Sequence, residues 1–271
     1  MKSVGIIIST YNNPKWLEKT LWGYLNQTYQ NFELLIADDG SGTETKELIE
    51  CYKNKYFPHL KHIWHEDKGF RKTRILNMAV LAAASEYLIF ADHDCIPRAD
   101  LVETHIRYAQ EGYMLSGGCF RLPMSISLSI KKEDVDSQKI FKISELKKRG
   151  LKNGWKNTKL IRSSSFASFM NFITPTKATW NGGCSSAWRK DIITVNGFNE
   201  DMQYGGEDRE FGERLFNLGI KSKQIRYSAI CLHLDHARPY KLPELIAQNK
   251  QIRKEVKKNK IIQTPHGINQ Y

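Results

Sequence analysis

Three short, continuous apolar runs predict buried strands, and each run ends in a cluster of polar residues. The runs cover residues 4–9, 32–37 and 87–91. Continuous apolar runs of this length are typical of parallel strands that are covered on both faces. Between the first two runs, apolar residues recur at helical spacing from residue 14 to about residue 27. The order strand, helix, strand predicts parallel strands with right-handed crossovers, and therefore an α/β fold.

Two carboxylates follow the third run directly, in the tripeptide Asp92-His93-Asp94. Open α/β sheets place their ligands at the carboxyl ends of the strands. Carboxylates are rarely buried without a partner, and hard oxygen ligands suit Mg²⁺ or Mn²⁺ shared with a substrate phosphate. The doublet therefore predicts a metal site. The alternative is that Asp92 or Asp94 only caps a helix opened by Pro97.

The first two runs also end in polar residues. Thr10, Tyr11 and Asn12 follow the first run, and the sequence Asp-Asp-Gly-Ser follows the second at residues 38–41. Asp39 can accept a hydrogen bond from a base or a ribose. Asp, Gly and Ser are also the favoured turn residues, and the turn is the preferred interpretation of this segment by itself.

A second carboxylate pair lies far along the chain, in Gly205-Gly206-Glu207-Asp208. The two glycines let the backbone approach a ligand closely. Helical spacing begins after Glu207, so Asp208 is expected near a helix N-terminus, where a carboxylate stays ionised as a general base must. The alternative is that these acids are solvated charges in an ordinary first helical turn.

His233 and His236 follow the apolar run 229–232. A single histidine is more often packed or hydrogen-bonded than a ligand, but alternation along a strand would aim His233 at the metal site. An imidazole ligand shifts the preference from Mg²⁺ toward Mn²⁺. We prefer His233 over His236 as the ligand.

Taken together, these motifs resemble family 2 glycosyltransferases with the GT-A fold. The segments ISTYNN (8–13), ADDGS (37–41), ADHD (91–94) and GGED (205–208) occur in that family's order and rough spacing. Segments 180–189, 197–200 and 204–210 are also similar to the C-terminal part of β-1,4-galactosyltransferases and to the transferase halves of bacterial chondroitin-type polymerases. The resemblance covers roughly residues 3–240. It implies a nucleotide-diphospho-sugar transferase fold, in which helices flank a Rossmann-like mixed sheet.

The resemblance also implies roles for particular residues. Asp208 would be the catalytic base, and Asp94 and His233 would bind the metal. Residues expected to bind the nucleotide are Thr10, Tyr11, Asn12, Asp39, Arg71, Arg74 and Asp92. Residues expected near the donor or acceptor sugar are Trp180, Asn181, Gly182, Gly183, Tyr204, Gly206 and Glu207. Two positions depart from the family's pattern: His93 stands inside the Asp-x-Asp, and Tyr204 stands where the galactosyltransferases have Trp, which leaves the sugars open.

The implied reaction moves a hexose or N-acetylhexosamine from a UDP-sugar to a saccharide or lipid-linked saccharide. A divalent ion, Mn²⁺ or Mg²⁺, would stabilise the departing diphosphate, with Arg71, Lys72 and Arg74 adding positive charge. One carboxylate base and in-line attack predict inversion. The expected setting is bacterial lipopolysaccharide, capsule or other surface polysaccharide synthesis.

Two other classes of protein would account for part of the sequence. A nucleotidyltransferase that makes nucleotide-sugars would carry a glycine-rich N-terminal loop, which segment 9–13 lacks. A basic nucleic-acid-binding protein would account for the net charge of +12, but it would leave the paired carboxylates unexplained. We therefore expect no nucleic-acid partner.

Basic residues concentrate in two segments. We expect a catalytic domain over residues 1–240, with a nucleotide-binding half (1–118), a basic insertion (121–168) and an acceptor half (169–240). The insertion is predicted to be helical over 140–151 and mobile to about residue 168. Residues 241–271 are expected to form a basic amphipathic helix and tail. This helix either packs on the domain or is attracted to anionic lipid or a phosphorylated acceptor.

The cysteines and the apolar segments bear on where the protein is located. The five cysteines show no CxxC spacing and are odd in number, which favours reduced thiols over a disulfide framework. No window approaches the roughly 20 apolar residues of a membrane-spanning helix, and no signal-peptide core is visible near the N-terminus. We expect a cytoplasmic location and leave open a peripheral position on the inner face of the membrane.

Overall fold

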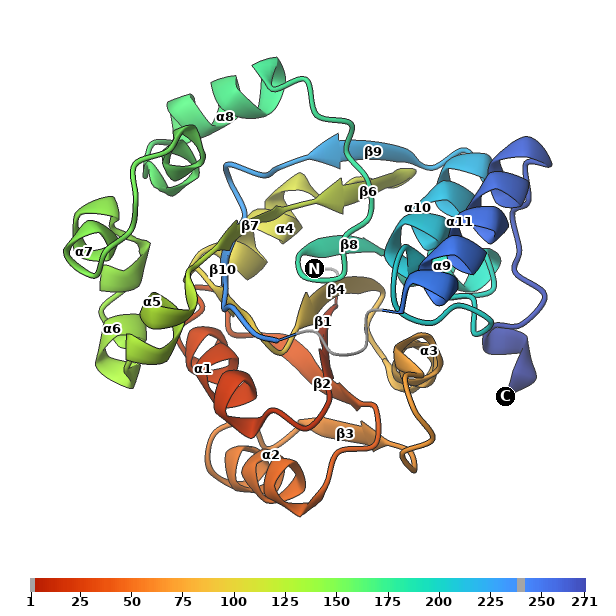
Figure 1. The fold of residues 1–271 in the computed structure, drawn as a ribbon, viewed down its shortest axis with the longest axis horizontal. Coiled ribbons are helices and arrows are strands. Elements are labelled where there is room, and N and C mark those ends of the chain that lie inside the picture. Colours follow the sequence, from red (N-terminus) through yellow and green to blue (C-terminus); the bar gives the residue numbers. More distant parts are fainter. Residues whose placement is uncertain (1–2, 238–241) are drawn as a thin grey trace.

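The computed structural model describes residues 3–237 and 242–271. Its centre is a seven-stranded mixed sheet with the strand order β3-β2-β1-β4-β8-β6-β9 (Figure 1). The strands are β1 Val4–Thr10, β2 Phe32–Asp38, β3 Lys61–Trp64, β4 Tyr87–Asp92, β6 Tyr113–Ser116, β8 Ser185–Trp188 and β9 Lys221–Gln224. β1, β2, β3 and β4 are parallel, whereas β8 is antiparallel to both β4 and β6. The three apolar runs form β1, β2 and β4, so the predicted mixed α/β sheet is confirmed.

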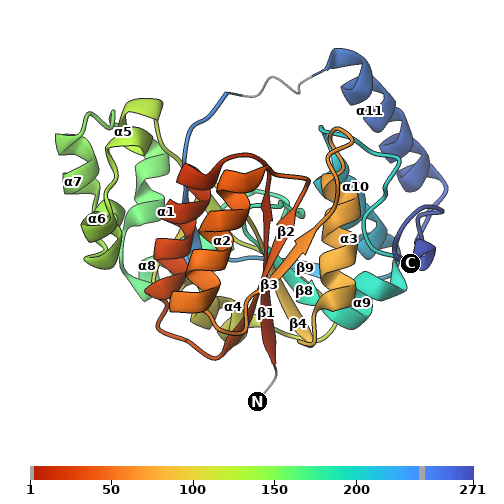
Figure 2. The same cartoon turned by 90° about the horizontal axis from the view of Figure 1, so that it is seen from below.

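Helices cover both faces of this sheet (Figure 2). Along β1, Ile6 and Ile8 join one hydrophobic core and Ile7 joins the other, as the alternation of a strand requires. The first core packs against α1 Pro14–Leu25, α2 Thr43–Lys55 and α4 Leu101–Tyr108. The second packs against α3 Lys72–Ala82, α9 Arg189–Thr194 and α10 Glu207–Asn217. Burial on both faces explains why the central strands are apolar without interruption.

A second, three-stranded sheet begins immediately after the Asp-His-Asp tripeptide. Its strand order is β5-β10-β7, from β5 Cys95–Pro97, β7 Gly118–Arg121 and β10 Ile230–His233. β10 ends at His233, and the backbone N–H of Leu234 donates to the carbonyl of Asp94 at 2.8 Å. The junction of the two sheets therefore brings the histidine segment to the end of β4.

The predicted basic insertion folds into short helices, and all but the last of them contribute side chains to one hydrophobic core. They are α5 Met124–Ser129, α6 Lys132–Asp136, η1 Lys139–Phe141, α7 Ile143–Lys148, η2 Trp155–Leu160 and α8 Ser164–Ile173. Val135, Phe141 and Leu146 are buried in this core together with Trp16 of α1 and Leu232 of β10. The single helix predicted over 140–151 is thus divided into η1 and α7. The stretch predicted to be mobile contains η2 and α8. Leu160 of η2 joins this core, whereas α8 is held by the hydrogen bonds of Asn171 with Ser228 and Tyr227.

The C-terminal segment packs on the catalytic domain. Helix α11 begins at Pro243, as predicted, and ends at Lys258; it lies beside α10 (Figures 1 and 2). After it, η3 (Ile268–Gln270) places Ile268 in the core beside α3. The boundary predicted at residue 240 lies outside the described residues. From residue 242 onward the segment packs on the same fold, which is one of the two alternatives left open for it. Over the described residues, every helix is too short or too polar to cross a membrane.

Candidate active site

Asp92, at the end of β4, is held by two donors. Ser9 Oγ, from the neighbouring strand β1, donates to Asp92 Oδ1 at 2.8 Å. Lys72 Nζ, at the start of α3, donates to the same oxygen at 2.6 Å. Burial opposes the charge of Asp92, but Lys72 outweighs it and lowers the pKa of the carboxyl below its usual value. Asp92 is therefore fixed as an anion whose second oxygen, Oδ2, is turned toward the Gly182–Gly183 segment.

Asp94 faces two histidines. Its Oδ2 lies 2.9 Å from Nε2 of His236 and 3.5 Å from Nε2 of His233. In both rings, Nδ1 lies 2.8 Å from a backbone carbonyl, which can only accept, so Nδ1 carries a hydrogen. In the neutral ring, Nε2 is then a bare lone pair that faces the carboxylate. That arrangement requires a shared cation, either a proton or a metal ion, and two imidazole nitrogens with one carboxylate oxygen suit Mn²⁺.

The electrostatics of Asp94 favour the anion that a metal needs. Burial raises its pKa, but the hydrogen bond from His236 and the charges of His233 and His93 outweigh burial and hold the pKa well below its ordinary value. The predicted pair of Asp94 and His233 is brought together as expected. His236, which we had ranked second, lies nearer to Asp94, because the chain turns back after β10 and returns its ring to the carboxylate.

Asp208, the predicted base, lies in the first turn of α10 beneath the Asn181–Gly183 segment. Its Oδ2 accepts from the backbone N–H of Gly182 at 2.9 Å, while the buried Oδ1 has no hydrogen-bond partner among the described residues. A Cβ on Gly182 would stand 2.9 Å from Asp208 Oδ2 and 3.0 Å from Lys72 Nζ, so only glycine fits here. A Cβ on Gly183 would stand 3.3 Å from Asp92 Oδ2. The two glycines thus lie between the two carboxylate groups, and an orphaned buried oxygen is poised to accept a proton.

Lys72 is the cation between these two groups. Burial opposes its charge, but Asp92, Asp208 and Glu207 outweigh burial and raise its pKa well above the ordinary value. On the other side, burial raises the pKa of Asp208 despite the nearby lysine, and burial together with Asp208 raises the pKa of Glu207 to about 7. We had expected the helix N-terminus to keep Asp208 strongly acidic. Burial opposes that effect, and it makes Asp208 a stronger base.

The loop that carries Asp208 is held from behind by α11. Gly205 and Gly206 adopt φ values of 114° and 106°, which favour glycine, and the Gly205 N–H donates to Glu207 Oε2 at 2.7 Å. Asn249 Nδ2, from α11, donates to the carbonyls of Gln203 and Gly205 at 2.9 and 3.2 Å. Ile246 packs where a Cβ of Gly205 would be, at 2.8 Å. The loop's conformation therefore depends on a helix that begins more than thirty residues later in the chain.

The predicted nucleotide pocket gathers at the ends of β1, β2 and β3. Asp39 accepts from His65 Nε2 at 2.7 Å and from the backbone N–H of Arg71 at 2.9 Å. Tyr11 is half-exposed, and its hydroxyl donates to Asp67 Oδ2 at 2.8 Å. Buried polar atoms without a partner in the described residues include Thr10 Oγ1, His65 Nδ1 and Arg71 Nε. Orphaned buried donors of this kind are expected where a ligand binds.

Asn12, also predicted at the nucleotide, has a clear structural role. It adopts a φ of 43°, its Oδ1 accepts from Gly42 N at 2.9 Å, and its N–H donates to Ser41 Oγ at 2.8 Å. Asn12 therefore ties the loop after β1 to the loop after β2. These contacts shape the pocket wall whether or not Asn12 also touches the nucleotide.

The two predicted arginines are placed differently from Lys72. The Arg71 side chain donates to the carbonyl of Glu66, and its backbone, as described above, holds Asp39. The Arg74 guanidinium lies 5.5 Å from the ring of Tyr271, in the C-terminal segment. Among these basic residues, Lys72 is therefore the one that contacts the Asp92 carboxylate.

Two aromatic residues were predicted to contact sugar. Trp180 is 1% exposed, and its ring packs against Phe90, Phe198 and Phe211, with the shortest centroid distance 4.7 Å. The structure assigns Trp180 to the core, so its predicted sugar contact is withdrawn. Tyr204 is half-buried and lies edge-on to Phe70 at 5.9 Å, in the loop that precedes Asp208. Its position is compatible with a sugar contact.

Asn181 and the residues that follow it form a tight turn. Asn181 Nδ2 donates to Ser116 Oγ and to the carbonyl of Cys184, both at 3.3 Å, and its backbone N–H donates to Ser185 Oγ. These bonds fix the turn at the start of β8. This turn directs the Gly182 N–H toward Asp208.

Ser9 and His65 were not predicted from sequence, and His236 was ranked second. Lys72 was predicted only to add positive charge, without its contact with Asp92. Ser9 lies at the end of the first apolar run, the signal that identified Asp39 and Asp92, and could have been found by the same rule. His65 follows β3, whose sequence Lys-His-Ile-Trp is not an apolar run, so this rule could not find it. Lys72 begins a helix, and nothing local distinguishes it from the adjacent Arg71. Its role depends on contacts with residues 20 to 136 positions away.

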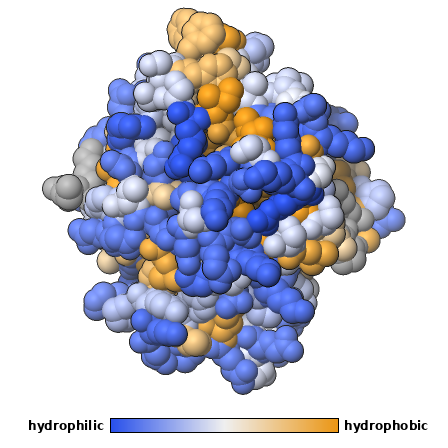
Figure 3. Space-filling model, turned by 90° about the vertical axis from the view of Figure 1, so that its left-hand side faces the viewer, coloured by the Kyte–Doolittle hydropathy of each residue, from blue (hydrophilic) through white to orange (hydrophobic). Residues whose placement is uncertain are grey.

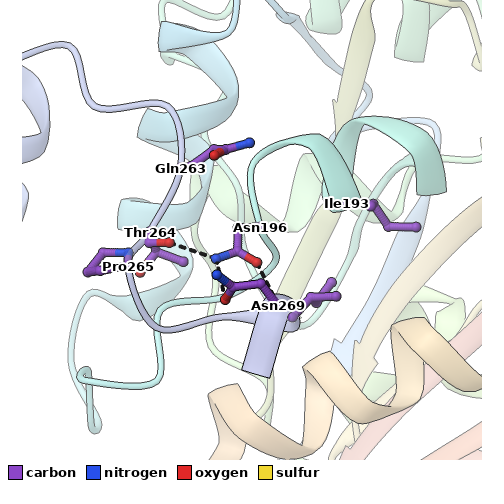
Figure 4. Close-up of a pocket in the computed structure, with 7 residues that line it drawn as sticks. Ile193, Asn196, Gln263, Thr264, Pro265 and Asn269 are labelled. Carbon is purple, nitrogen blue, oxygen red and sulfur yellow. Dashed lines mark hydrogen bonds between the residues drawn. The ribbon is translucent and has the colours of Figure 1, made fainter. Parts of the chain in front are cut away.

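A cavity of about 580 Å³ lies away from these residues, between α9 and the C-terminal segment (Figure 4). Asn196 lines it and donates to the Thr264 carbonyl at 2.7 Å and to Asn269 Oδ1 at 2.8 Å. The backbone N–H of Asn269 donates back to Asn196 Oδ1. The polar groups of Asn196 and Asn269 are thus already hydrogen-bonded in anchoring the C-terminal segment. We therefore assign this cavity to the packing of that segment against the rest of the fold.

Two family profiles match parts of the chain. The sequence profile described as "Glycosyl transferase family 2" matches residues 5–174, and the profile described as "N-terminal domain of galactosyltransferase" matches residues 163–237. Chondroitin synthase of Escherichia coli is 25% identical over 82% of this chain and 33% of its own length. Hyaluronan synthase of Pasteurella multocida is 24% identical over 82% of this chain and 24% of its length. The chain thus spans a third or less of these two relatives.

Solved structures show the same fold at low identity. TarS 1–349 of S. aureus in complex with UDP-GlcNAc aligns with a TM-score of 0.62 and 16% identity, over 96% of this chain and 70% of that one. The mannosyltransferase PcManGT from Pyrobaculum calidifontis, in complex with GDP-Man and Mn²⁺, aligns with a TM-score of 0.58 and 16% identity over 96% and 72%. These likenesses establish the GT-A fold.

Proposed function

The chain belongs to glycosyl transferase family 2, and we propose that it transfers a hexose or N-acetylhexosamine from a UDP-sugar to a saccharide hydroxyl, with inversion and with a divalent metal. The observation that carries the proposal is the pair of carboxylate groups on either side of Lys72. Asp92 and Asp94 are held as anions on one side, and Asp208, with a raised pKa and a free oxygen, lies on the other. Carboxyls whose pKa is lowered stay ionised and can bind a cation, whereas one whose pKa is raised can accept a proton.

A uridine nucleotide is favoured by the structural relatives. TarS binds UDP and UDP-GlcNAc, whereas the mannosyltransferase binds GDP-Man, so the fold by itself accepts either base. In this chain, the pocket at the ends of β1–β3 offers Asp39 as an acceptor for a base N–H, with Tyr11 beside it for stacking. The orphaned Thr10 hydroxyl and Arg71 Nε supply further polar contacts.

Asp94, His233 and His236 would hold the metal, and Mn²⁺ fits this mixed oxygen and nitrogen set better than Mg²⁺. When bound, such an ion acts as a Lewis acid toward a diphosphate. Lys72 would also stabilise the diphosphate, because it contributes a fixed positive charge that Asp92 orients. Lys72 thereby favours a leaving group whose negative charge grows.

Asp208 would accept the proton of the acceptor hydroxyl. Gly182 N–H fixes one of its oxygens and leaves Oδ1 for that proton. A positioned base of this kind contributes about 10²–10⁴-fold to the rate. One base and one displacement give inversion, so an α-linked donor would yield a β-linked product. Gly206, Glu207 and Tyr204, in the same loop, would contact the donor or acceptor sugar.

The setting we propose is the synthesis of bacterial surface polysaccharide, lipopolysaccharide or capsule, in the cytoplasm or at the inner face of the membrane. It is supported by the relation to chondroitin and hyaluronan synthases. The nucleotidyltransferase and nucleic-acid alternatives are not carried forward, because neither accounts for the family 2 match.

The test is UDP release from a panel of UDP-sugars with Mn²⁺, for the wild type and for Asp94→Ala. We expect one donor to be hydrolysed or transferred by the wild type and spared by the variant. GDP release from GDP-mannose with no UDP release would contradict the uridine assignment. Failure of the wild type to bind either nucleotide would contradict the proposal as a whole.

A further inference from the structure

Helix α8 presents an apolar face that residues 3–237 and 242–271 leave exposed. Phe172 is 89% exposed, Phe169 is 58% exposed, and Ile173 lies beside them at helical spacing. Trp155, in the preceding η2, is 68% exposed. Large apolar side chains gathered in this way on a soluble surface mark an interaction site.

The exposed face is a built feature, because the opposite face of α8 is firmly anchored. Ala167 is buried, and Asn171 Nδ2 donates to Ser228 Oγ while its Oδ1 accepts from the Tyr227 N–H, both at 2.9 Å. Gln224 Nε2 donates to the carbonyls of Asn171 and Thr174 at 2.7 and 2.8 Å. The phenylalanines are therefore held outward by a fixed helix.

The surroundings of this face are strongly basic. Residues 121–177 contain thirteen Lys and Arg against four Asp and Glu, a net charge of +9 in a chain whose total is +12. Three of the four acids are already paired with bases of the same segment, in Arg149–Asp134, Lys132–Asp136 and Lys148–Glu145. Lys152, Lys156 and Arg162, which flank Trp155 and lead into α8, are exposed.

The figures show how these features are arranged. α5–α8 form one edge of the molecule in both ribbon views. Seen from that edge, an apolar projection stands at the top, in the direction where Figure 1 places α8, above a broad hydrophilic surface (Figure 3). Aromatic side chains beside basic ones are the combination that inserts at the boundary of an anionic bilayer.

We propose that the exposed face of α8, with Trp155 and the flanking basic residues, docks the protein on an anionic lipid bilayer. The occupant is a membrane surface because the patch combines inserted aromatic rings with a large excess of positive charge. α11, the basic helix first considered for this role, packs on α10 and the Asp208 loop. From α8 the chain runs directly into Asn181–Gly183, so docking would set the catalytic site close to the lipid surface.

The test is flotation of the purified full chain with phosphatidylcholine vesicles that contain 30% phosphatidylglycerol, compared with pure phosphatidylcholine. Binding is expected only to the anionic vesicles and is expected to weaken at high salt. Phe169→Ser with Phe172→Ser should lower binding about tenfold or more. Lys152→Gln, Lys156→Gln and Arg162→Gln together should do the same.

The matched control removes three exposed charges from α11 instead, with Lys250→Gln, Lys254→Gln and Lys258→Gln. This variant should keep its vesicle binding. Loss of binding in the α11 variant and not in the α8 variants would overturn the proposal. So would phenylalanine variants that change only the oligomeric state, because a second copy would then be the occupant. The readout needs no turnover, so this proposal and the proposed function can fail separately.

Discussion

The two halves of the active site are built by different means. On the donor side, Asp92 and Asp94 lie at the end of a central strand, and their partners come from the neighbouring β1, from the start of α3, and from the end of β10 and the turn after it. On the base side, Asp208 lies in a helix turn behind two glycines with positive φ, and the loop is held by Asn249 of α11. The sheet thus fixes the groups that bind, whereas helix packing positions the group that abstracts a proton.

The electrostatics of the two halves differ in the same way. The pKa values of Asp92 and Asp94 are lowered, and those of Glu207 and Asp208 are raised. All four carboxyls are pushed toward protonation by burial, so burial does not separate them. Positive partners outweigh burial on the donor side and fail to do so on the base side. One half is therefore electrostatically suited to a cation, and the other to accepting a proton.

The largest effect is expected for Asp208→Asn. The amide keeps the shape and can still accept from the Gly182 N–H, but it cannot take a proton. Turnover at saturating donor should fall by about 10²–10⁴-fold. Asp201→Asn, at an exposed carboxylate seven residues earlier, is the control and should leave turnover unchanged. Near-normal turnover in Asp208→Asn would remove it as the base.

Lys72→Met should affect both halves, because Lys72 is the cation they share. Loss of a fixed charge at a developing anion costs roughly 10²–10³-fold in turnover. The pH profile gives a second readout. Lys72 lowers the pKa of Asp208, so its removal raises that pKa further. Since the base works only when ionised, the acidic limb of kcat/KM should move to higher pH. An unmoved limb would mean that Lys72 does not act on Asp208.

Asp94→Ala should act on binding first. Substitutions that merely misorient a metal ligand cost about 10–100-fold in metal affinity, and loss of the ligand itself should cost at least as much. We expect the Mn²⁺-dependent part of UDP affinity to fall by this factor, measured by titration with and without the metal. An unchanged Mn²⁺ dependence would exclude Asp94 as a ligand.

The smallest effect is expected for Asn249→Leu, which tests whether α11 positions the base. It leaves two loop carbonyls without their donor, at a cost of about 1–3 kcal/mol of stability for each buried group. Turnover should fall about threefold to tenfold, below the roughly hundredfold cost of misplacement by an ångström, with UDP affinity unchanged.

Asn217→Leu is the matched control. Asn217 Nδ2 also donates to two carbonyls, of Val256 and Ile261, at the far end of α10. Its loss should lower the thermal unfolding temperature in a similar way and spare turnover. If both variants lose turnover equally, α11 stabilises the fold without positioning Asp208.

The donor half was largely predictable from sequence, because strand ends are local signals. Continuous apolar runs located β1, β2 and β4, and the polar residues directly after them located Thr10, Asp39, Asp92 and Asp94. Parallel strands bring such residues to one edge without further information.

The base half and the basic segments depend on distant packing. Trp180, beside the predicted sugar-binding turn, was expected to contact sugar. Its ring fills the core instead, because Phe198 and Phe211, from other parts of the chain, pack against it. Two basic segments were predicted, the insertion and the C-terminal helix. In the C-terminal segment α11 packs on α10, whereas α8, which begins in the insertion, leaves its aromatic face exposed. Composition gives the amphipathic character of a helix, and only the tertiary fold decides which face finds a partner.

The assignment of donor binding to Asp92 and Asp94, and of proton abstraction to Asp208, is tested most directly by one experiment. It is the calorimetric titration of UDP into Asp208→Asn in the presence of Mn²⁺. The donor half should be intact, so we predict a Kd within about threefold of the wild type, in a protein whose turnover is lost. A loss of UDP binding as large as that of Asp94→Ala would contradict the account, because Asp208 would then belong to the half that binds the donor.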